Sequence, residues 1–234
     1  MASRDSVVRD ASCESTANDG GRTEHWIALD WLHGASWTGI GDRATPTISD
    51  EGFFAVGPQG MLVCLDPISG QEIWKRDLCR DATRTPPIWG FSSSLLVVDG
   101  MVMVHAGGKG DAGVFAYDAS SGDIRWKTAS GDHSYSSPQI ATFYNQPGIL
   151  MAINSGLQFL NVADGATIWN HDWVVDNYRA IQSLVIGNEI LLASSLGAGT
   201  RKLSISKIGE SWNVGNRVYA RNSQEAACFE FATK

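Results

Sequence analysis

The eleven residues Cys64-Leu-Asp-Pro-Ile-Ser-Gly-Gln-Glu-Ile-Trp74 recur with few changes as Ala116-Tyr-Asp-Ala-Ser-Ser-Gly-Asp-Ile-Arg-Trp126. Both segments follow the pattern small-x-Asp-x-x-Ser-Gly-x-x-x-Trp. A third copy, Phe159-Leu-Asn-Val-Ala-Asp-Gly-Ala-Thr-Ile-Trp169, has Asn in place of Asp but keeps the spacing from Gly to Trp. A degenerate fourth copy, Ser204-Ile-Ser-Lys-Ile-Gly-Glu-Ser-Trp212, is one residue shorter between Gly and Trp. The tryptophans are 43 to 52 residues apart, which predicts an array of similar structural units.

A second, independent marker begins each unit. It reads Thr45-Pro-Thr-Ile48, Ser93-Ser-Leu-Leu96, Ser137-Pro-Gln-Ile140 and Gln182-Ser-Leu-Val185, at intervals of 44 to 48 residues. A period of about 40 to 50 residues is typical of propeller blades and of helical arrays. The two markers therefore agree on one repeat length but leave two architectures open.

Short apolar runs separated by turn residues favour the propeller. In the second unit these runs are 94–98, 101–105, 113–117 and 123–127, and Asp99-Gly100 between the first two is a strong hairpin signal. No segment has a sustained apolar period of 3.6 residues, so a helical array is disfavoured. We therefore predict an all-β fold, namely a β-propeller built from four-stranded antiparallel blades.

Each position of the eleven-residue motif has a structural explanation. The Asp can accept backbone N–H groups two residues further on and so form an Asx-turn, and the Gly supplies a positive φ. The Trp ring can pack against the neighbouring blade, which would contribute about 3 to 5 kcal/mol. Because the motif recurs in every unit, whereas a catalytic site occurs once, we interpret its residues as structural. They are Asp66, Gly70, Trp74, Asp118, Gly122, Trp126, Asn161, Gly165 and Trp169.

The motif resembles the tryptophan-docking motif, Ala-x-Asp-x-x-x-Gly-x-x-x-Trp, of the quinoprotein-alcohol-dehydrogenase-like propellers, or PQQ-like repeat proteins. The resemblance covers about residues 43–212, and Trp89-Gly-Phe-Ser-Ser and Tyr135-Ser-Ser-Pro138 are similar to planctomycete-type members. This family contains catalytic quinoproteins and non-catalytic envelope proteins such as the Bam-type outer-membrane assembly lipoproteins. The resemblance implies a ring of seven or eight blades and a location in the periplasm or cell envelope.

The length of the chain implies only part of such a ring. We predict about four to five blades, at 43–88, 89–133, 134–178 and 179–234, with 1–42 as an N-terminal segment or a degenerate blade. A fragment, a half-ring completed by dimerisation and a small closed ring all remain open. We favour a fragment, because residues 1–21 have no apolar signal-peptide segment and residues 222–234 lose the repeat character.

Composition excludes several classes of function. The chain has 234 residues, 18 Lys and Arg against 25 Asp and Glu, and a net charge of −7, which disfavours a nucleic-acid partner. No apolar run approaches the roughly 18 residues of a transmembrane helix. The cysteines have no CxxC spacing and no His partner at zinc-site spacing, so free, mostly buried thiols are favoured over a disulfide. They are Cys13, Cys64, Cys79 and Cys228.

The sequence contains no recognisable catalytic constellation. The Gly107-Gly-Lys-Gly110 run lacks the spacing of a phosphate loop, His105 in an apolar strand is interpreted as a core histidine, and the adjacent Asp132-His-Ser134 cannot form a triad. Members with dehydrogenase activity hold PQQ with a Cys-Cys disulfide and bind Ca²⁺ through acidic and amide oxygens, and this chain has no adjacent cysteines. We therefore predict no cofactor, no metal and no catalytic residue.

The leading functional prediction is a non-catalytic scaffold that binds a protein at the cell envelope, with possible self-association. The alternative is part of a PQQ-dependent alcohol dehydrogenase, with PQQ and Ca²⁺ in a site completed elsewhere, and a weaker one is a sensor module. Loops before the first strand of each blade gather on one face of a propeller, and such loops commonly carry binding residues. Arginine and aromatic side chains suit a protein interface. The candidates are Asp42, Arg43, Trp89, His133, Tyr135, Asn177 and Arg179.

Overall fold

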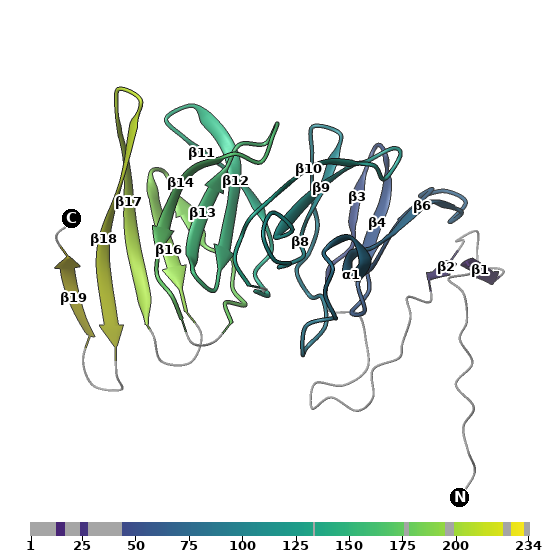
Figure 1. Ribbon diagram of the computed structural model, residues 1–234, viewed down its shortest axis with the longest axis horizontal. Helices are drawn as coiled ribbons and strands as arrows, with labels where there is room; N and C mark the ends of the chain where they lie inside the picture. Colours follow the sequence, from purple (N-terminus) through teal and green to yellow (C-terminus); the bar gives the residue numbers. More distant parts are fainter. Residues whose placement is uncertain are drawn as a thin grey trace, which may run out of the picture.

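The computed structural model describes residues 13–16, 24–27, 44–132, 134–175, 178–194, 199–221 and 226–231, and the regular secondary structure of these residues is almost entirely β-strand (Figure 1). Within these residues, four antiparallel sheets of four or five strands follow one another along the chain and lie side by side in an open row. Each sheet is a meander in which every strand pairs with the next strand in sequence. The predicted all-β fold and its propeller blades, present as a partial ring, are confirmed.

The strands of each blade have the following bounds. The first blade contains β3 (Thr47–Ser49), β4 (Gly52–Val56), β5 (Met61–Leu65) and β6 (Glu72–Asp77). The second contains β7 (Leu96–Val98), β8 (Met101–His105), β9 (Val114–Asp118) and β10 (Ile124–Thr128). The third contains β11 (Gln139–Phe143), β12 (Gln146–Ile153), β13 (Gly156–Leu160) and β14 (Thr167–Asp172). The fourth contains β15 (Leu184–Ile186), β16 (Glu189–Ala193), β17 (Thr200–Ile208), β18 (Ser211–Arg221) and β19 (Ala226–Phe231).

Three further elements complete the described chain. The strands β1 (Cys13–Thr16) and β2 (Glu24–Ile27) pair as a separate hairpin. One helical turn, α1 (Leu78–Asp81), follows β6, and the Asp77 carboxylate caps it by accepting from the backbone N–H groups of Cys79 and Arg80. Most of the predicted N-terminal segment 1–42 lies outside the described residues, and the predicted blade boundaries stay predictions.

The fourth sheet differs from the prediction because it has five strands instead of four. Its β17–β18 hairpin closes through the two-residue turn Gly209-Glu210, with Gly209 at a φ of 59°, a conformation that suits glycine. The degenerate motif is too short for the longer turn of the other blades. The β18 strand is therefore long, and β19 pairs along its second half.

Apolar side chains fill the space between consecutive blades. Alternate residues of each strand point to opposite faces of its sheet, so each middle blade packs against two neighbours. Phe54 of the first blade packs near Phe115 of the second, and Met103 of the second packs near Met151 of the third. Phe159 of the third blade belongs to one cluster with Ile190 and Leu203 of the fourth. The core is thus a series of inter-blade layers.

The motif turns are built around their acidic or amide residue. The Asp66 carboxylate accepts from the backbone N–H groups of Ser69 and Ile68 at 2.6 and 3.0 Å, and these bonds hold its pKa below the ordinary value. The Asn161 side-chain oxygen accepts from the backbone N–H of Ala163 at 2.9 Å. The turn between the third and fourth strands of a blade is therefore rigid, as an Asx-turn requires.

The tryptophan of one blade docks onto the motif turn of the next blade. Trp74 Nε1 donates to the carbonyl of Ala119 at 2.8 Å, and Trp126 Nε1 donates to the carbonyl of Val162 at 3.0 Å. A Cβ atom on Gly122 would lie 2.8 Å from the Trp74 ring, and one on Gly165 would lie 2.5 Å from the Trp126 ring. The motif glycine therefore leaves room for a neighbouring indole, besides adopting a positive φ.

The joint between the third and fourth blades lacks this hydrogen bond. Trp169 is buried and stacks on Phe159, with ring centroids 5.2 Å apart. Its Nε1 has no hydrogen-bond partner among the described residues. Trp212 on β18 packs back toward the third blade, edge-on to Phe159. The shortened turn of the fourth motif thus removes the acceptor that the first two joints provide.

The second sequence marker joins the first strands of neighbouring blades. The backbone N–H of Thr45 donates to Ser94 Oγ at 3.0 Å, and the backbone N–H of Ser94 donates to Ser137 Oγ at 2.8 Å. Thr47 also donates its hydroxyl to the carbonyl of Leu95. The small polar residues of the marker therefore form hydrogen bonds between one blade and the next.

The contact between Gly165 and Trp126 can be tested with a matched pair of glycine variants. We expect Gly165→Ala to lower the free energy of unfolding by about 2 kcal/mol, because the added Cβ overlaps the indole and the residue has a φ of 70°. Gly187→Ala should cost about 1 kcal/mol, since Gly187 also has a positive φ but nothing lies within 4 Å. Urea unfolding followed by far-UV circular dichroism measures both. Equal losses would show that the indole contact is unimportant.

Candidate functional site

One end of the blades carries all the segments that connect one blade to the next. Because the strands alternate in direction, the inter-blade segments 78–95, 129–138 and 173–183 share an end with the turns between second and third strands. The motif turns lie at the opposite end. We call the first end the inter-blade loop face.

Three aromatic side chains from three consecutive inter-blade loops meet on this face. The ring centroids of Trp89 and Tyr135 are 5.4 Å apart, those of Trp89 and Tyr178 are 5.3 Å apart, and those of Tyr135 and Tyr178 are 5.0 Å apart. The Trp89 backbone N–H also donates to the Tyr135 hydroxyl at 3.4 Å. Trp89 and Tyr178 are exposed, whereas Tyr135 is buried beneath them. We refer to these three residues as the aromatic patch.

The structure brings together only some of the predicted binding residues. Trp89 and Tyr135 are in contact, and Asp42, Arg43, His133 and Asn177 lie outside the described residues. Tyr178 was missed by the sequence reasoning. A signal was available, because Tyr178 precedes its unit marker by four residues, as Trp89 does.

Arg179 does not belong to the exposed face, contrary to the sequence expectation, because its side chain is fully buried. Its guanidinium donates to the carbonyls of Ile153, Ala193 and Trp173 at 2.7, 3.0 and 2.5 Å. Burial, with a smaller effect from the nearby Arg201, lowers the pKa of Arg179 to about 10. The side chain therefore ties the inter-blade loop to strands of the third and fourth blades.

A second arginine reinforces the same joint. The guanidinium carbons of Arg179 and Arg201 lie 4.5 and 4.2 Å from the centre of the Trp173 ring. Arg201 Nη1 also lies 3.2 Å from His171 Nε2. Such cation–π contacts stabilise most when they are desolvated, so this cluster is a structural feature of the blade junction.

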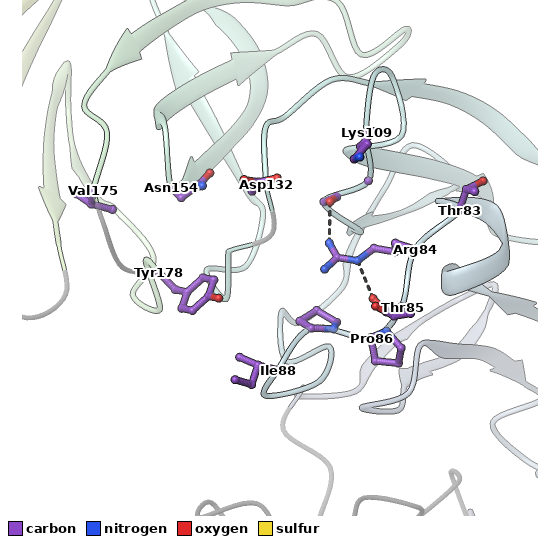
Figure 2. A pocket seen from close by; sticks show the side chains of 13 residues that line it. Thr83, Arg84, Thr85, Pro86, Ile88, Lys109, Asp132, Asn154, Val175 and Tyr178 are labelled. Carbon is purple, nitrogen blue, oxygen red and sulfur yellow. Dashed lines mark hydrogen bonds between the residues drawn. The ribbon is translucent and has the colours of Figure 1, made fainter.

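A pocket of about 590 Å³ lies beside the aromatic patch, between the inter-blade loops (Figure 2). Pro86, Pro87, Ile88, Val175 and Tyr178 provide its apolar lining, and the polar lining consists of Thr83, Arg84, Thr85, Lys109, Asp132 and Asn154 together with the backbone of Gly107 and Gly108. The pocket therefore combines an apolar wall with two cationic side chains.

Arg84 is held in this pocket by backbone carbonyls. Its Nε donates to the carbonyl of Thr85, and its Nη1 donates to the carbonyl of Gly107 at 2.6 Å (Figure 2). Nη1 also donates to the carbonyl of Ala106 at 2.9 Å. The backbone amides of Gly107 and Gly108 are already bonded to Gly113 and Ala112 within the hairpin. The glycine-rich run is thus a hairpin loop, as predicted, and the amides of Gly107 and Gly108 are not available to a phosphate.

His105 is a core residue, as the sequence indicated. It is fully buried, with Nδ1 3.3 Å from the carbonyl of Ser134 and Nε2 2.9 Å from Ser130 Oγ. Because a carbonyl can only accept, Nδ1 carries the proton and Nε2 accepts from the serine. Burial lowers the pKa of His105 to about 4, so the ring is neutral near pH 7.

This burial predicts a loss of stability in acid. Since the pKa of His105 lies near 4 in the folded protein and near 6.5 in the unfolded chain, the folded state binds fewer protons. The stabilisation is complete above about pH 6.5 and declines toward pH 4, reaching a loss of about 2 kcal/mol at pH 5. Urea unfolding at pH 6.5 and at pH 5 gives the free energy of unfolding at each pH. The decrease between these two pH values should be smaller for His105→Gln than for the wild type. If the variant lost as much stability between these pH values as the wild type, the loss could not be attributed to His105.

The described residues do not assemble a cluster of metal-ligating side chains. No group of three or more His, Cys, Asp or Glu side chains gathers in that part of the chain, so the oxygen ligands that Ca²⁺ prefers are not assembled there. Cys64 and Cys79 are free, and burial raises the pKa of Cys64 to about 11. Among the described residues, no helix has the length and apolar character needed to cross a membrane. The prediction that no cofactor binds stays a prediction.

Four-stranded blades joined by a tryptophan and an Asx-Gly turn define the class of PQQ-like repeat propellers. The family model described as outer membrane protein assembly factor BamB matches residues 17–234. The chain belongs to that family, and the predicted resemblance is confirmed.

Two sequence relatives agree with this assignment. The chain is 28% identical over 131 residues to the outer membrane protein assembly factor BamB of Moranella endobia (strain PCIT), covering 53% of this chain and 31% of that protein. It is 27% identical over 140 residues to the protein of the same name in Yersinia pestis, covering 56% and 33%. The crystal structure of BamB from Moraxella catarrhalis matches with a TM-score of 0.49 and 14% identity, over 80% of this chain and 54% of that chain. The matches span about a third of the length of the two curated relatives.

Proposed function

We propose that this chain forms part of a non-catalytic propeller scaffold of the cell envelope, which holds a protein partner on its inter-blade loop face. The observation that carries the proposal is the aromatic patch, because side chains of three consecutive loops pack together there and leave the rings of Trp89 and Tyr178 exposed. The relatives named as outer membrane protein assembly factors support an envelope location and a role in assembling other proteins.

The surroundings of the patch suit a protein interface. Ile88 and Ile181, which flank it in sequence, are 67% and 62% exposed. Exposed apolar side chains that cluster with aromatic residues are typical of binding surfaces, and tryptophan and tyrosine supply much of the affinity in such surfaces. A rigid joint beneath the loops, built by Arg179, limits the conformational entropy lost on binding.

Site-specific photo-crosslinking tests this proposal in cells that produce the protein. A photoreactive phenylalanine analogue at Ile88 or Ile181 should crosslink to the same partner, and the product should be in the envelope fraction. The matched controls are Ile68 and Ile208, which are 85% and 77% exposed but lie at the opposite end of the blades. Crosslinks that form equally from the control positions, or only from them, would refute the proposal.

Native mass spectrometry with PQQ and CaCl₂ added tests the remaining predictions. The scaffold hypothesis expects no PQQ adduct on the purified chain. A stoichiometric adduct would instead favour part of a quinoprotein dehydrogenase, and a dimer would support completion of the ring by a second copy.

A further inference from the structure

We propose that the pocket beside the aromatic patch binds an extended peptide segment in which a carboxylate lies next to an aromatic or aliphatic side chain. This inference rests on the proposed function, because the segment would belong to the protein partner. It adds the chemistry by which that partner is recognised.

The apolar half of the pocket is continuous with the aromatic patch. Tyr178 belongs to both, and Ile88 lines the pocket next to Trp89. In Figure 2 the side chains of Tyr178 and Ile88 lie on one side of the opening and Lys109 lies on the other. An apolar side chain of a ligand would therefore rest on the first side while a neighbouring polar group reaches the second.

The polar half carries uncompensated positive charge. Arg84 and Lys109 line it together with one carboxylate, the exposed Asp132. Among the described residues, neither cation forms an ion pair, although most other lysines pair with Asp or Glu. The bonds of Arg84 to carbonyls use Nε and Nη1, which fixes the guanidinium without neutralising it. In a chain with a net charge of −7, this local excess matches an anionic ligand group.

A peptide carboxylate fits these features better than a small anion does. Guanidinium and ammonium groups form charge-assisted hydrogen bonds with carboxylates. The adjoining aromatic and isoleucine side chains extend the surface across three inter-blade loops, and a small anion would leave that surface uncovered. An extended peptide presents successive side chains to different sides, so one residue can meet the cations while its neighbours meet the apolar wall.

An array of synthetic pentapeptides tests the inference with the purified full chain. The peptides are acetylated and amidated, carry Phe, Leu or Ser at positions two and four, and carry Glu, Gln or Lys at position three. We expect the Glu peptides with Phe or Leu neighbours to bind about three- to fivefold better than their Gln counterparts, as expected for a partly exposed charge pair. Lys109→Gln should at least halve this preference.

Two controls keep the result interpretable. Lys75→Gln changes an exposed lysine on β6 that pairs with Glu72, and it should leave all binding unchanged. Lys109→Glu should favour the Lys peptides. Equal binding of Glu and Gln peptides to the wild type, or a preference unaffected by both Lys109 variants, would overturn the inference. If the array fails while Ile88 and Ile181 still crosslink to a partner, the peptide chemistry is wrong and the proposed function stands.

Discussion

Replacing Trp126 by alanine is expected to lower the free energy of unfolding by about 3 to 5 kcal/mol. The indole is buried in the layer between the second and third blades, where it touches Gly165 and donates to the carbonyl of Val162 at 3.0 Å. Removing it leaves a cavity against a glycine, which has no side chain to fill the space. It also leaves a buried carbonyl without its donor. Chemical denaturation followed by far-UV circular dichroism gives the loss directly.

The hydrogen bond can be separated from the packing with Trp→Phe substitutions at two joints. Trp126→Phe keeps most of the ring but loses the Nε1 donor, and should cost at least about 1 kcal/mol more than Trp169→Phe. Trp169 is buried to a similar degree, but its Nε1 has no partner among the described residues. Equal losses at the two positions would mean that docking depends on the ring alone.

Local patterns were sufficient to predict the strands of the second blade. The run 101–105 coincides with β8 (Met101–His105), and the run 113–117 is displaced by one residue from β9 (Val114–Asp118). Turns bound both strands, and the conformation of a turn depends on adjacent residues. Asp99 and Gly100, for example, both adopt a positive φ. Hairpin geometry is local in sequence, so a single chain reveals it.

The contacts between neighbouring blades could not be predicted from the motif in the same way. Gly165 and Trp169 occur in one motif copy, but Gly165 packs against Trp126 of the preceding copy. The sequence therefore indicated the correct residue types and assigned glycine only its positive φ. Its second role depends on how successive blades stack, which is a non-local property.

The candidate site was predicted only in part for a similar reason. Trp89 and Tyr135 are in contact, but Arg179 follows the exposed Tyr178 and is itself fully buried. Polar residues of loops are usually exposed, so the sequence favoured an accessible arginine. The carbonyls that hold it belong to residues 153, 173 and 193, and only the folded structure brings these together.

Arg179→Met is expected to lower the free energy of unfolding by about 3 kcal/mol or more, since it leaves three inward-facing carbonyls without donors. Methionine retains much of the apolar volume, so the loss reports chiefly on the hydrogen bonds and on the contact with Trp173. The substitution also removes a buried positive charge, and this gain offsets part of the loss. Burial disfavours that charge, since it lowers the pKa of Arg179 to about 10. We expect the three orphaned carbonyls to outweigh that gain.

The same substitution at Arg125 is the matched control for this prediction. Arg125 is an exposed residue on β10 whose Nε lies 3.2 Å from Asp118, and a surface ion pair of this kind contributes at most about 1 kcal/mol. Arg179→Lys provides a second test, because an ammonium group keeps the charge but cannot span three separate carbonyls. Arg179→Lys should lower the free energy of unfolding nearly as much as Arg179→Met does. If Arg179→Met were instead as mild as Arg125→Met, water or a rearranged loop would have to satisfy the carbonyls, and the inter-blade loop face would be less rigid than its hydrogen bonds indicate.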